Sequence, residues 1–193
     1  MRRNKGLDLS AVWFLIIANL IVFIATYISN DVYNDFVRIF GLNTSSFSER
    51  PWTIVTSLFI HAGLFHIFGN MITLYFFGTY VSRLIGENKF LIIYTLGGIV
   101  GNAFYMLLGD PDSTVIGASG AVFAVGGALT ILRPKLKVII FPVPVPLPLW
   151  IAVIGIFLII SIFPNVAWQA HLGGLLLGLI AGFIFRKKQR FYF

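Results

Sequence analysis

The sequence contains no cysteine and few charged residues. Of its 193 residues, none is cysteine, 11% are charged and 58% are hydrophobic. The absence of cysteine excludes disulfide bonds, thiolate metal sites and cysteine nucleophiles. A soluble domain of this length could not cover so much apolar surface with so few charges. The composition therefore predicts a membrane protein.

The apolar residues are concentrated in six segments that are candidates to cross a bilayer as helices. These segments are Leu9–Ile28, Thr56–Leu84, Phe90–Leu108, Ser119–Leu132, Leu147–Phe163 and Ala170–Phe185. We predict an all-α, polytopic membrane protein, a six-transmembrane-helix bundle that forms one domain over residues 1–193. The basic start resembles that of a signal peptide. No small-residue cleavage pattern follows it, so the first segment is predicted to remain as a transmembrane helix.

The basic residues predict the orientation of the chain. The net charge is +7, and a cytoplasmic N-terminus places twelve basic residues inside and two, Arg38 and Arg50, outside. The twelve are Arg2, Arg3, Lys5, Arg83, Lys89, Arg133, Lys135, Lys137, Arg186, Lys187, Lys188 and Arg190. We expect an integral, multi-pass protein of the plasma membrane with both termini cytoplasmic. Short basic groups between apolar segments favour contact with lipid headgroups over nucleic acid.

Two connecting stretches have patterns of their own. In the long loop from Ser29 to Trp52, apolar residues recur at helical spacing, which is compatible with an amphipathic helix in the membrane interface and equally with an ordinary polar loop. The stretch Pro142–Pro148 cannot form a regular helix, because its prolines lack amide donors. We expect an extended cytoplasmic linker there, and whether it binds a partner stays open.

Four polar side chains from three segments are predicted to meet. With the orientation above, Ser119, His171, His66 and Asn70 all lie in the outer halves of their helices. His66 and Asn70 are four residues apart and so share one helix face. A polar group in hydrocarbon is costly unless it has a partner, and the simplest partners are one another.

A serine and a neutral histidine in contact are a nucleophile and its general base. We therefore predict Ser119 as the nucleophile and His171 as the base. The backbone N–H of Ser119, at a helix start, would stabilise an oxyanion together with the side chains of His66 and Asn70. No carboxylate is placed to orient His171, so the pair would be a dyad. The pattern calls for no cofactor.

A zinc site is disfavoured by the spacing of the histidines. His61 and His66 are five residues apart, which puts them on different helix faces, and there is no H-E-x-x-H motif. We expect no metal and assign His61 a structural role, anchoring the outer loop.

Small residues are expected to bring the serine and the histidine together. His171, Gly174, Gly178 and Gly182 form one stripe, while Ser119 shares a stripe with Phe123, Gly126 and Gly127, beside Gly120 and Ala124. Glycines at four-residue spacing let neighbouring backbones approach closely. If the two faces pack together, Ser119 and His171 meet at the top of the contact.

The combination of H-x4-H-x3-N from His61 to Asn70, G-x-S-G around Ser119 and A-H-x-x-G-x-x-x-G around His171 closely resembles the rhomboid intramembrane serine proteases. The resemblance covers nearly the whole chain and implies the same roles for Ser119, His171, His66 and Asn70. It also implies that Trp150 through Phe163 line a lateral gate, and that the turn from Val166 to Trp168 caps the site.

Three positions depart from the pattern of that family. Thr53 follows Trp52 where arginine is common, Ser82 replaces a glutamate, and Phe123 stands where some members have tyrosine. None of these changes removes a catalytic atom.

The predicted function is therefore an intramembrane serine endopeptidase that cleaves transmembrane segments of other membrane proteins, most simply single-pass ones, within the lipid bilayer. The alternative is a non-catalytic relative that binds and escorts transmembrane helices, which would normally lack Ser119 or His171. A transporter is disfavoured, since no intramembrane charge offers an ion-coupling site.

Overall fold

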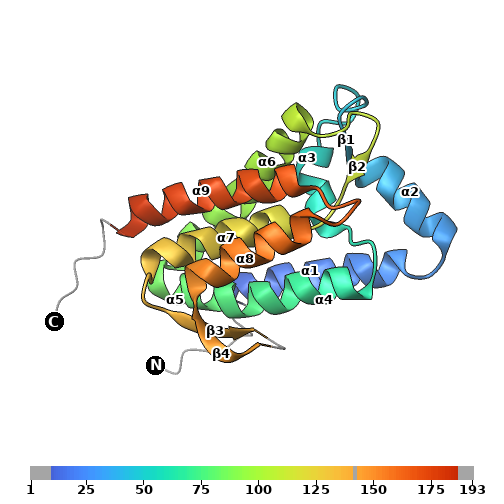
Figure 1. Cartoon of the computed structure of the whole chain (residues 1–193). Helices are drawn as coiled ribbons and strands as arrows, with labels where there is room; N and C mark the ends of the chain where they lie inside the picture. Colours follow the sequence, from blue (N-terminus) through green and yellow to red (C-terminus); the bar gives the residue numbers. More distant parts are fainter. Residues whose placement is uncertain (1–9, 141–142, 187–193) are drawn as a thin grey trace, which may run out of the picture.

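The structure is a computed structural model that describes residues 10–140 and 143–186, and it is built almost entirely of helices (Figure 1). The helices are α1 (Ala11–Thr26), α2 (Asn30–Phe40), α3 (Thr53–Thr56), α4 (Leu64–Thr73), α5 (Thr79–Ile85), α6 (Glu87–Leu108), α7 (Ser119–Leu132), α8 (Leu149–Ser161) and α9 (Trp168–Arg186). Short strands form two antiparallel pairs, β1 (Leu42–Asn43) with β2 (Thr114–Val115), and β3 (Lys137–Ile140) with β4 (Val143–Pro148).

Some of the sequence predictions fall on residues that the structure does not describe. They are the start of the first segment at Leu9, the residue Pro142, and the basic residues Arg2, Arg3, Lys5, Lys187, Lys188 and Arg190.

The surface of the bundle is that of a membrane protein. Large apolar side chains are exposed on many helices, among them Phe14 (63%), Phe65 (96%) and Phe183 (55%). A soluble monomer rarely exposes such extensive apolar surface, whereas lipid covers it. Within the described residues, three helical stretches have the length and composition to cross a membrane, namely Leu64–Ile85, Glu87–Leu108 and Trp168–Arg186. The fold is thus all-α and polytopic, while the count of six spans stays a prediction.

The three remaining predicted segments correspond to shorter apolar helices. They are α1 with 16 residues, α7 with 14 and α8 with 13. Apart from the second segment, the boundaries that fall on described residues lie within three residues of the predicted ones.

The second predicted segment is wrong at its start. Instead of one helix from Thr56, the chain forms α3, a 3₁₀ turn over Ser57–Phe59 and a break, and α4 begins only at Leu64. The break falls at Gly63, which is extended and precedes the first helical residue. Because the residues on both sides are apolar, the hydrophobic run concealed it. A π-helical turn over Leu74–Gly78 then joins α4 to α5.

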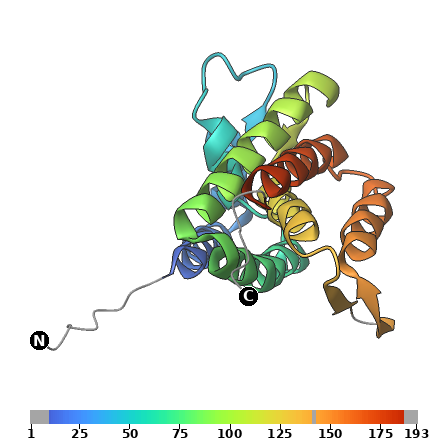
Figure 2. The same cartoon turned by 90° about the vertical axis from the view of Figure 1, so that its left-hand side faces the viewer.

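Helix α7 occupies the centre of the molecule. Seen end-on, its yellow ribbon lies among α4, α5, α6 and α9, with α8 on the opposite side from α6 (Figure 2). Its residues from Gly120 to Leu129 are all buried. A helix that is apolar all round is typical of a buried position, and here it carries the predicted nucleophile at its first residue.

The two ends of the bundle differ in content. The start of α1, the end of α9 and the β3–β4 pair lie at one end, while α2, α3 and the β1–β2 pair lie at the other (Figure 1). The chain therefore begins and ends its described helices on the same side, as the predicted topology requires.

The proline-rich stretch is extended as predicted, but it is not a free linker. Residues 143–148 form β4, paired with β3 in the register Lys137 with Pro148 and Val138 with Leu147. Prolines at 144, 146 and 148 alternate with Val143, Val145 and Leu147, so the missing N–H groups all lie on one side of the strand. The other residues keep their N–H groups for pairing, which is how an edge strand tolerates proline.

The long first loop contains a helix, so the helical interpretation of its spacing is confirmed. Ser29 Oγ accepts from the N–H of Val32 at the start of α2. The last carbonyls of α2 are hydrogen-bonded by side chains from the segment around α3. Arg50 Nη1 donates to Arg38 O, Trp52 Nε1 to Ile39 O (3.2 Å), and Thr56 Oγ1 to Phe40 O (2.8 Å). These bonds satisfy the C-terminal carbonyls of the helix and fix α2 against α3.

Candidate active site

Ser119 and His171 come from different helices and meet toward the end of the bundle that holds α2 and α3. Ser119 is the first residue of α7, and His171 lies in the first turn of α9. Ser119 Oγ lies 2.7 Å from His171 Nε2, which is hydrogen-bond distance, and His171 is only 5% exposed. Because Ser119 begins its helix, its N–H has no acceptor within the helix.

The contact between α7 and α9 is made by backbone against backbone. A Cβ added at Gly174 would overlap Gly120 O, and one added at Gly178 would overlap Ala124 O. The two small-residue faces therefore pack as expected, but the face of α7 that touches α9 is that of Gly120 and Ala124. Of the stripe that begins at Ser119, Ser119, Phe123 and Gly126 line a cavity, whereas Gly127 packs against Leu175 of α9.

An aromatic ring holds the imidazole of His171 from the side. The Phe123 ring lies 4.9 Å from the His171 ring at an interplanar angle of 34°, and Phe123 in turn contacts Phe157 of α8 edge-on at 6.0 Å. Within residues 10–140 and 143–186, His171 Nδ1 is buried and has no hydrogen-bond partner. The orientation of His171 therefore comes from packing and from Ser119, without a carboxylate.

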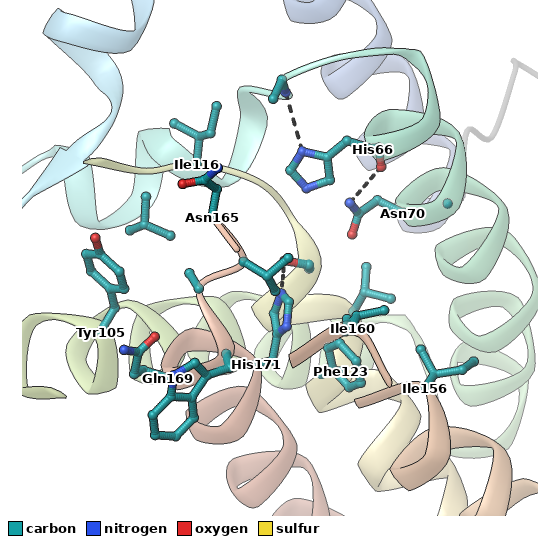
Figure 3. Close-up of a pocket in the computed structure, with 18 of the residues that line it drawn as sticks. His66, Asn70, Tyr105, Ile116, Phe123, Ile156, Ile160, Asn165, Gln169 and His171 are labelled. Atoms are coloured by element: carbon teal, nitrogen blue, oxygen red, sulfur yellow. Dashed lines mark hydrogen bonds between the residues drawn. The ribbon is translucent and has the colours of Figure 1, made fainter. Parts of the chain in front are cut away.

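His66 and Asn70 project from α4 into the same space (Figure 3). His66 Nδ1 accepts from the N–H of Ala62 at 3.4 Å, so in the neutral ring the proton is assigned to Nε2. Asn70 Nδ2 donates to His66 O at 2.9 Å, which uses one of its two N–H groups. Each side chain thus retains one N–H that is available to a ligand.

Gly117 separates His66 from Ser119. Its φ of +119° lies in the region that side-chain-bearing residues rarely adopt. An added Cβ would also lie 2.7 Å from His66 Nε2 and 3.8 Å from Ser119 Oγ. The first glycine of G-x-S-G is therefore required twice, for backbone conformation and for the space that brings His66 close to the serine.

The short loop before Ser119 is fixed from the other side by the segment after α3. The N–H of Gly117 donates to Ser57 O at 2.9 Å, and the N–H of Ala118 donates to His61 Nε2 at 3.4 Å. His61 is 1% exposed, and burial, followed by the neighbouring His66, lowers its pKa to about 3. A neutral His61 can accept a hydrogen bond from the N–H of Ala118. The sequence predicted only that His61 would anchor the outer loop.

Two residues that support this loop were not predicted from the sequence. Ser57 and Asn102 are 1% and 3% exposed, and Asn102 Nδ2 donates to Ser57 Oγ. An asparagine in the middle of an apolar segment was the available signal, since buried amides require partners.

The four predicted site residues line one cavity of about 950 Å³. Phe65 of α4 and Phe77 of the π-helical turn after it line one wall, and α8 contributes Val153, Ile156 and Ile160 to another. The turn Val166–Trp168 lines it as well, in keeping with the expected cap. Of the predicted gate segment, the middle of α8 lines the cavity, whereas Trp150 and Phe163 are not among the lining residues.

Comparison with known proteins identifies the family. The family model described as the Rhomboid domain matches residues 48–188, which is most of the chain. The chain belongs to the rhomboid family.

Several individual proteins are similar to this rhomboid. It is 34% identical to "RHOMBOID-like protein 12, mitochondrial" of Arabidopsis thaliana, over 94% of this chain and 60% of the relative. It is 28% identical to "Putative rhomboid protease YdcA" of Bacillus subtilis, over 79% and 76%, and 31% identical to "Rhomboid protein 1, mitochondrial" of Saccharomyces cerevisiae, over 80% and 49%. The chain thus spans about half to three quarters of the length of these relatives.

Within the rhomboid family, the departure at Thr53 has a local explanation. Thr53 is 2% exposed, and its Oγ1 donates to Arg50 O at 2.6 Å. Arg50 in turn reaches the end of α2. This chain has no arginine at position 53. Arg50 instead fixes the first loop, through its hydrogen bond to the end of α2.

Proposed function

We propose that this rhomboid is a serine endopeptidase that hydrolyses peptide bonds within or beside transmembrane segments of other membrane proteins. The observation that carries the proposal is the 2.7 Å contact between Ser119 Oγ and His171 Nε2 at the wall of a cavity between α4 and α8. A nucleophile and a base in hydrogen-bond contact beside a substrate-sized cavity are the parts that acyl transfer needs.

In the first half of the proposed reaction, Ser119 Oγ attacks the carbonyl carbon of the scissile bond. His171 Nε2 takes the hydroxyl proton and then gives it to the leaving amine as the C–N bond breaks. In the second half, His171 takes a proton from water and the resulting hydroxide attacks the acyl carbon. The ester bond to Ser119 Oγ then breaks, and His171 returns the proton to Ser119 Oγ. No cofactor or metal takes part in this sequence.

Negative charge develops on the carbonyl oxygen in both halves. Three donors are available to it: the N–H of Ser119, His66 Nε2–H and the second N–H of Asn70. The accepted bond at His66 Nδ1 supports the Nε2–H tautomer, and Gly117 leaves the approach from His66 unobstructed. Donors held in place before the reaction lower its barrier by about 3–4 kcal/mol each.

The substrate enters, in this proposal, from the lipid between α4 and α8. The cavity walls there are mostly apolar, which suits a transmembrane segment that has partly unwound so that one peptide bond is accessible. Single-pass proteins are the simplest partners, because one helix can then move sideways to the site. Trp150 through Phe163 would act as the gate, and the turn from Val166 to Trp168 would cover the site after entry.

We further propose six spans forming one domain over residues 1–193, with both termini in the cytoplasm and the protein in the plasma membrane. The common end of α1 and α9 supports the even number of spans. Two of the relatives are named as mitochondrial, so a mitochondrial membrane is the alternative location. A reporter inserted between Asp110 and Ser113 should be external, and one fused after Phe193 cytoplasmic.

The activity is tested by incubating the purified protein with a labelled single-pass substrate in detergent or vesicles. We expect the wild type to cleave the substrate. The folded Ser119→Ala and His171→Ala variants should not cleave it. The double variant should be no worse than either single one, since the two residues act as a unit. Binding of the helix without cleavage would favour the escort alternative.

A further inference from the structure

Asn102 lies in α6, outside the catalytic cavity, and connects to the nucleophile loop through one residue. Its Nδ2 donates to Ile54 O at 2.8 Å and to Ser57 Oγ at 2.9 Å. Ser57 O then accepts the N–H of Gly117 at 2.9 Å. A buried asparagine amide has two N–H groups, and both are used to hold the segment that receives the loop.

The same part of α6 also touches the helix that carries the base. A Cβ added at Gly101 would lie 2.5 Å from Ala170 O, next to His171, while Gly98 is in contact with Leu58. Helix α6 therefore presents one face to the 54–58 segment, at Gly98 and Asn102, and a neighbouring face to the start of α9. Asn102 fixes the loop before Ser119 against the helix that also positions His171.

We propose that Asn102 is a positioning residue for the reaction, acting through Ser57 to set where the Gly117–Ser119 backbone stands relative to His171 and His66. This inference rests on the proposed function, because the reaction is what makes that placement matter. Neither Asn102 nor Ser57 is among the residues that line the cavity, so neither touches substrate. Displacement of a reacting group by about 1 Å costs on the order of 10²-fold in rate.

The variants separate positioning from general stability. Asn102→Leu keeps the number and branching of the side-chain heavy atoms and removes both donors, and Ser57→Ala removes only the accepting hydroxyl while leaving the carbonyl that Gly117 uses. Asn19→Leu is the matched control. Asn19 is a fully buried asparagine in α1 whose Nδ2 donates to Leu15 O of its own helix at 2.8 Å, so this bond does not hold the nucleophile loop.

Three measurements are made on the full chain in one detergent: kcat and KM for a transmembrane substrate, amide hydrogen exchange of the peptide that covers residues 114–118, and melting temperature. Asn102→Leu should lower kcat on the order of 10²-fold with KM unchanged, and the N–H groups of Gly117 and Ala118 should exchange faster. Ser57→Ala should act in the same direction, and the double variant should be no worse than the more impaired single one. Asn19→Leu should lower only the melting temperature.

The proposal is overturned if Asn102→Leu lowers kcat no more than Asn19→Leu does, or if the effects of Asn102→Leu and Ser57→Ala multiply. Should Asn102→Leu fail to fold, Ser57→Ala alone decides between the same outcomes. If the wild type cleaves nothing, the proposed function fails, while the exchange of the 114–118 peptide still supports or overturns the role of Asn102 in holding the loop.

Discussion

The two sides of α7 are packed in opposite ways. Toward α6 and α9 the helices are close-packed, since a Cβ at Gly97 of α6 would overlap the Ala124 methyl group and one at Gly178 of α9 would overlap the Ala124 carbonyl. Toward α4 and α8 the neighbouring side chains enclose a cavity of about 950 Å³. Ser119 and His171 lie at the boundary between the two sides.

For the proposed reaction, this difference separates the parts of the site that must stay fixed from the parts that must admit a substrate. The distance between nucleophile and base is set on the close-packed side, where protein interiors tolerate little change of volume. In the proposed reaction the substrate would contact the loosely packed side, where α8 lines the cavity with the apolar side chains Val153, Ile156 and Ile160. Packing on the close side, with the Phe123 ring against His171, takes the place of the orienting carboxylate found in a triad.

The largest expected effect comes from adding a side chain on the close-packed side. Gly178→Val should abolish activity and lower the melting temperature steeply, because the new Cβ would overlap the Ala124 carbonyl and backbones cannot yield as side chains do. Gly155→Val is the matched control in α8, since nothing lies within 4 Å of its added Cβ. Both variants carry the same change of helix propensity. Equal melting temperatures for Gly178→Val and Gly155→Val would contradict the close packing between α7 and α9.

The next effect concerns the donors on the cavity side. His66→Ala and Asn70→Ala should each lower kcat by about 10²–10³-fold if each stabilises the developing negative charge. KM should change little, because that charge exists only in the transition state.

Phe68→Ala serves as the control for the donor variants, since Phe68 lies on the same helix and is 64% exposed. Rates and melting temperatures are compared for all three proteins. If Asn70→Ala lost stability but kept its rate per folded molecule, Asn70 would belong to helix packing.

Stability should also depend on pH through His61. Burial holds the pKa of His61 at about 3, below the value of about 6.5 in an unfolded chain. Above pH 6.5 His61 is neutral in both the folded and the unfolded protein, so its contribution to the free energy of unfolding does not change with pH. As the pH falls below 6.5, the unfolded chain gains a proton that the folded protein excludes, and stability should drop by about 2 kcal/mol at pH 5. Urea unfolding of the wild type and of His61→Gln between pH 7.5 and 5 measures this. A decline in His61→Gln as steep as in the wild type would be the contrary result.

The smallest effect is expected from filling the open side. Nothing lies within 4 Å of a Cβ added at Gly69, which lines the cavity from α4. Gly69→Val should raise KM severalfold while leaving the melting temperature close to that of the wild type. A collapse of stability like that of Gly178→Val would show that the cavity side is as closely packed as the other.

Much of this architecture could be predicted from the sequence, because hydrophobic length and helical spacing are local signals. Ser119 and His171 could be paired because each is a polar group in an apolar segment that needs a partner. The break before Leu64 and the strand pairing of Val143–Pro148 could not be predicted, since the first lies in a continuous apolar run and the second depends on a partner strand.

The hydrogen bonds of Asn102 could not be predicted for a related reason. Its partners, Ile54 and Ser57, are 48 and 45 residues away in the chain, so no local pattern links them. The same limit applies to the bond between His61 and the Ala118 amide, which depends on how the break before α4 turns the chain back toward α7.

The most direct test of the account is the reactivity of Ser119 itself. A fluorophosphonate probe is incubated with the folded wild type and with His171→Ala, and the modified residue is located by mass spectrometry. We expect an adduct on Ser119 in the wild type and its loss, or slowing on the order of 10³-fold or more, in His171→Ala at an unchanged melting temperature. Modification of another serine, or equal labelling of Ser119 in both proteins, would contradict a nucleophile that is activated by His171.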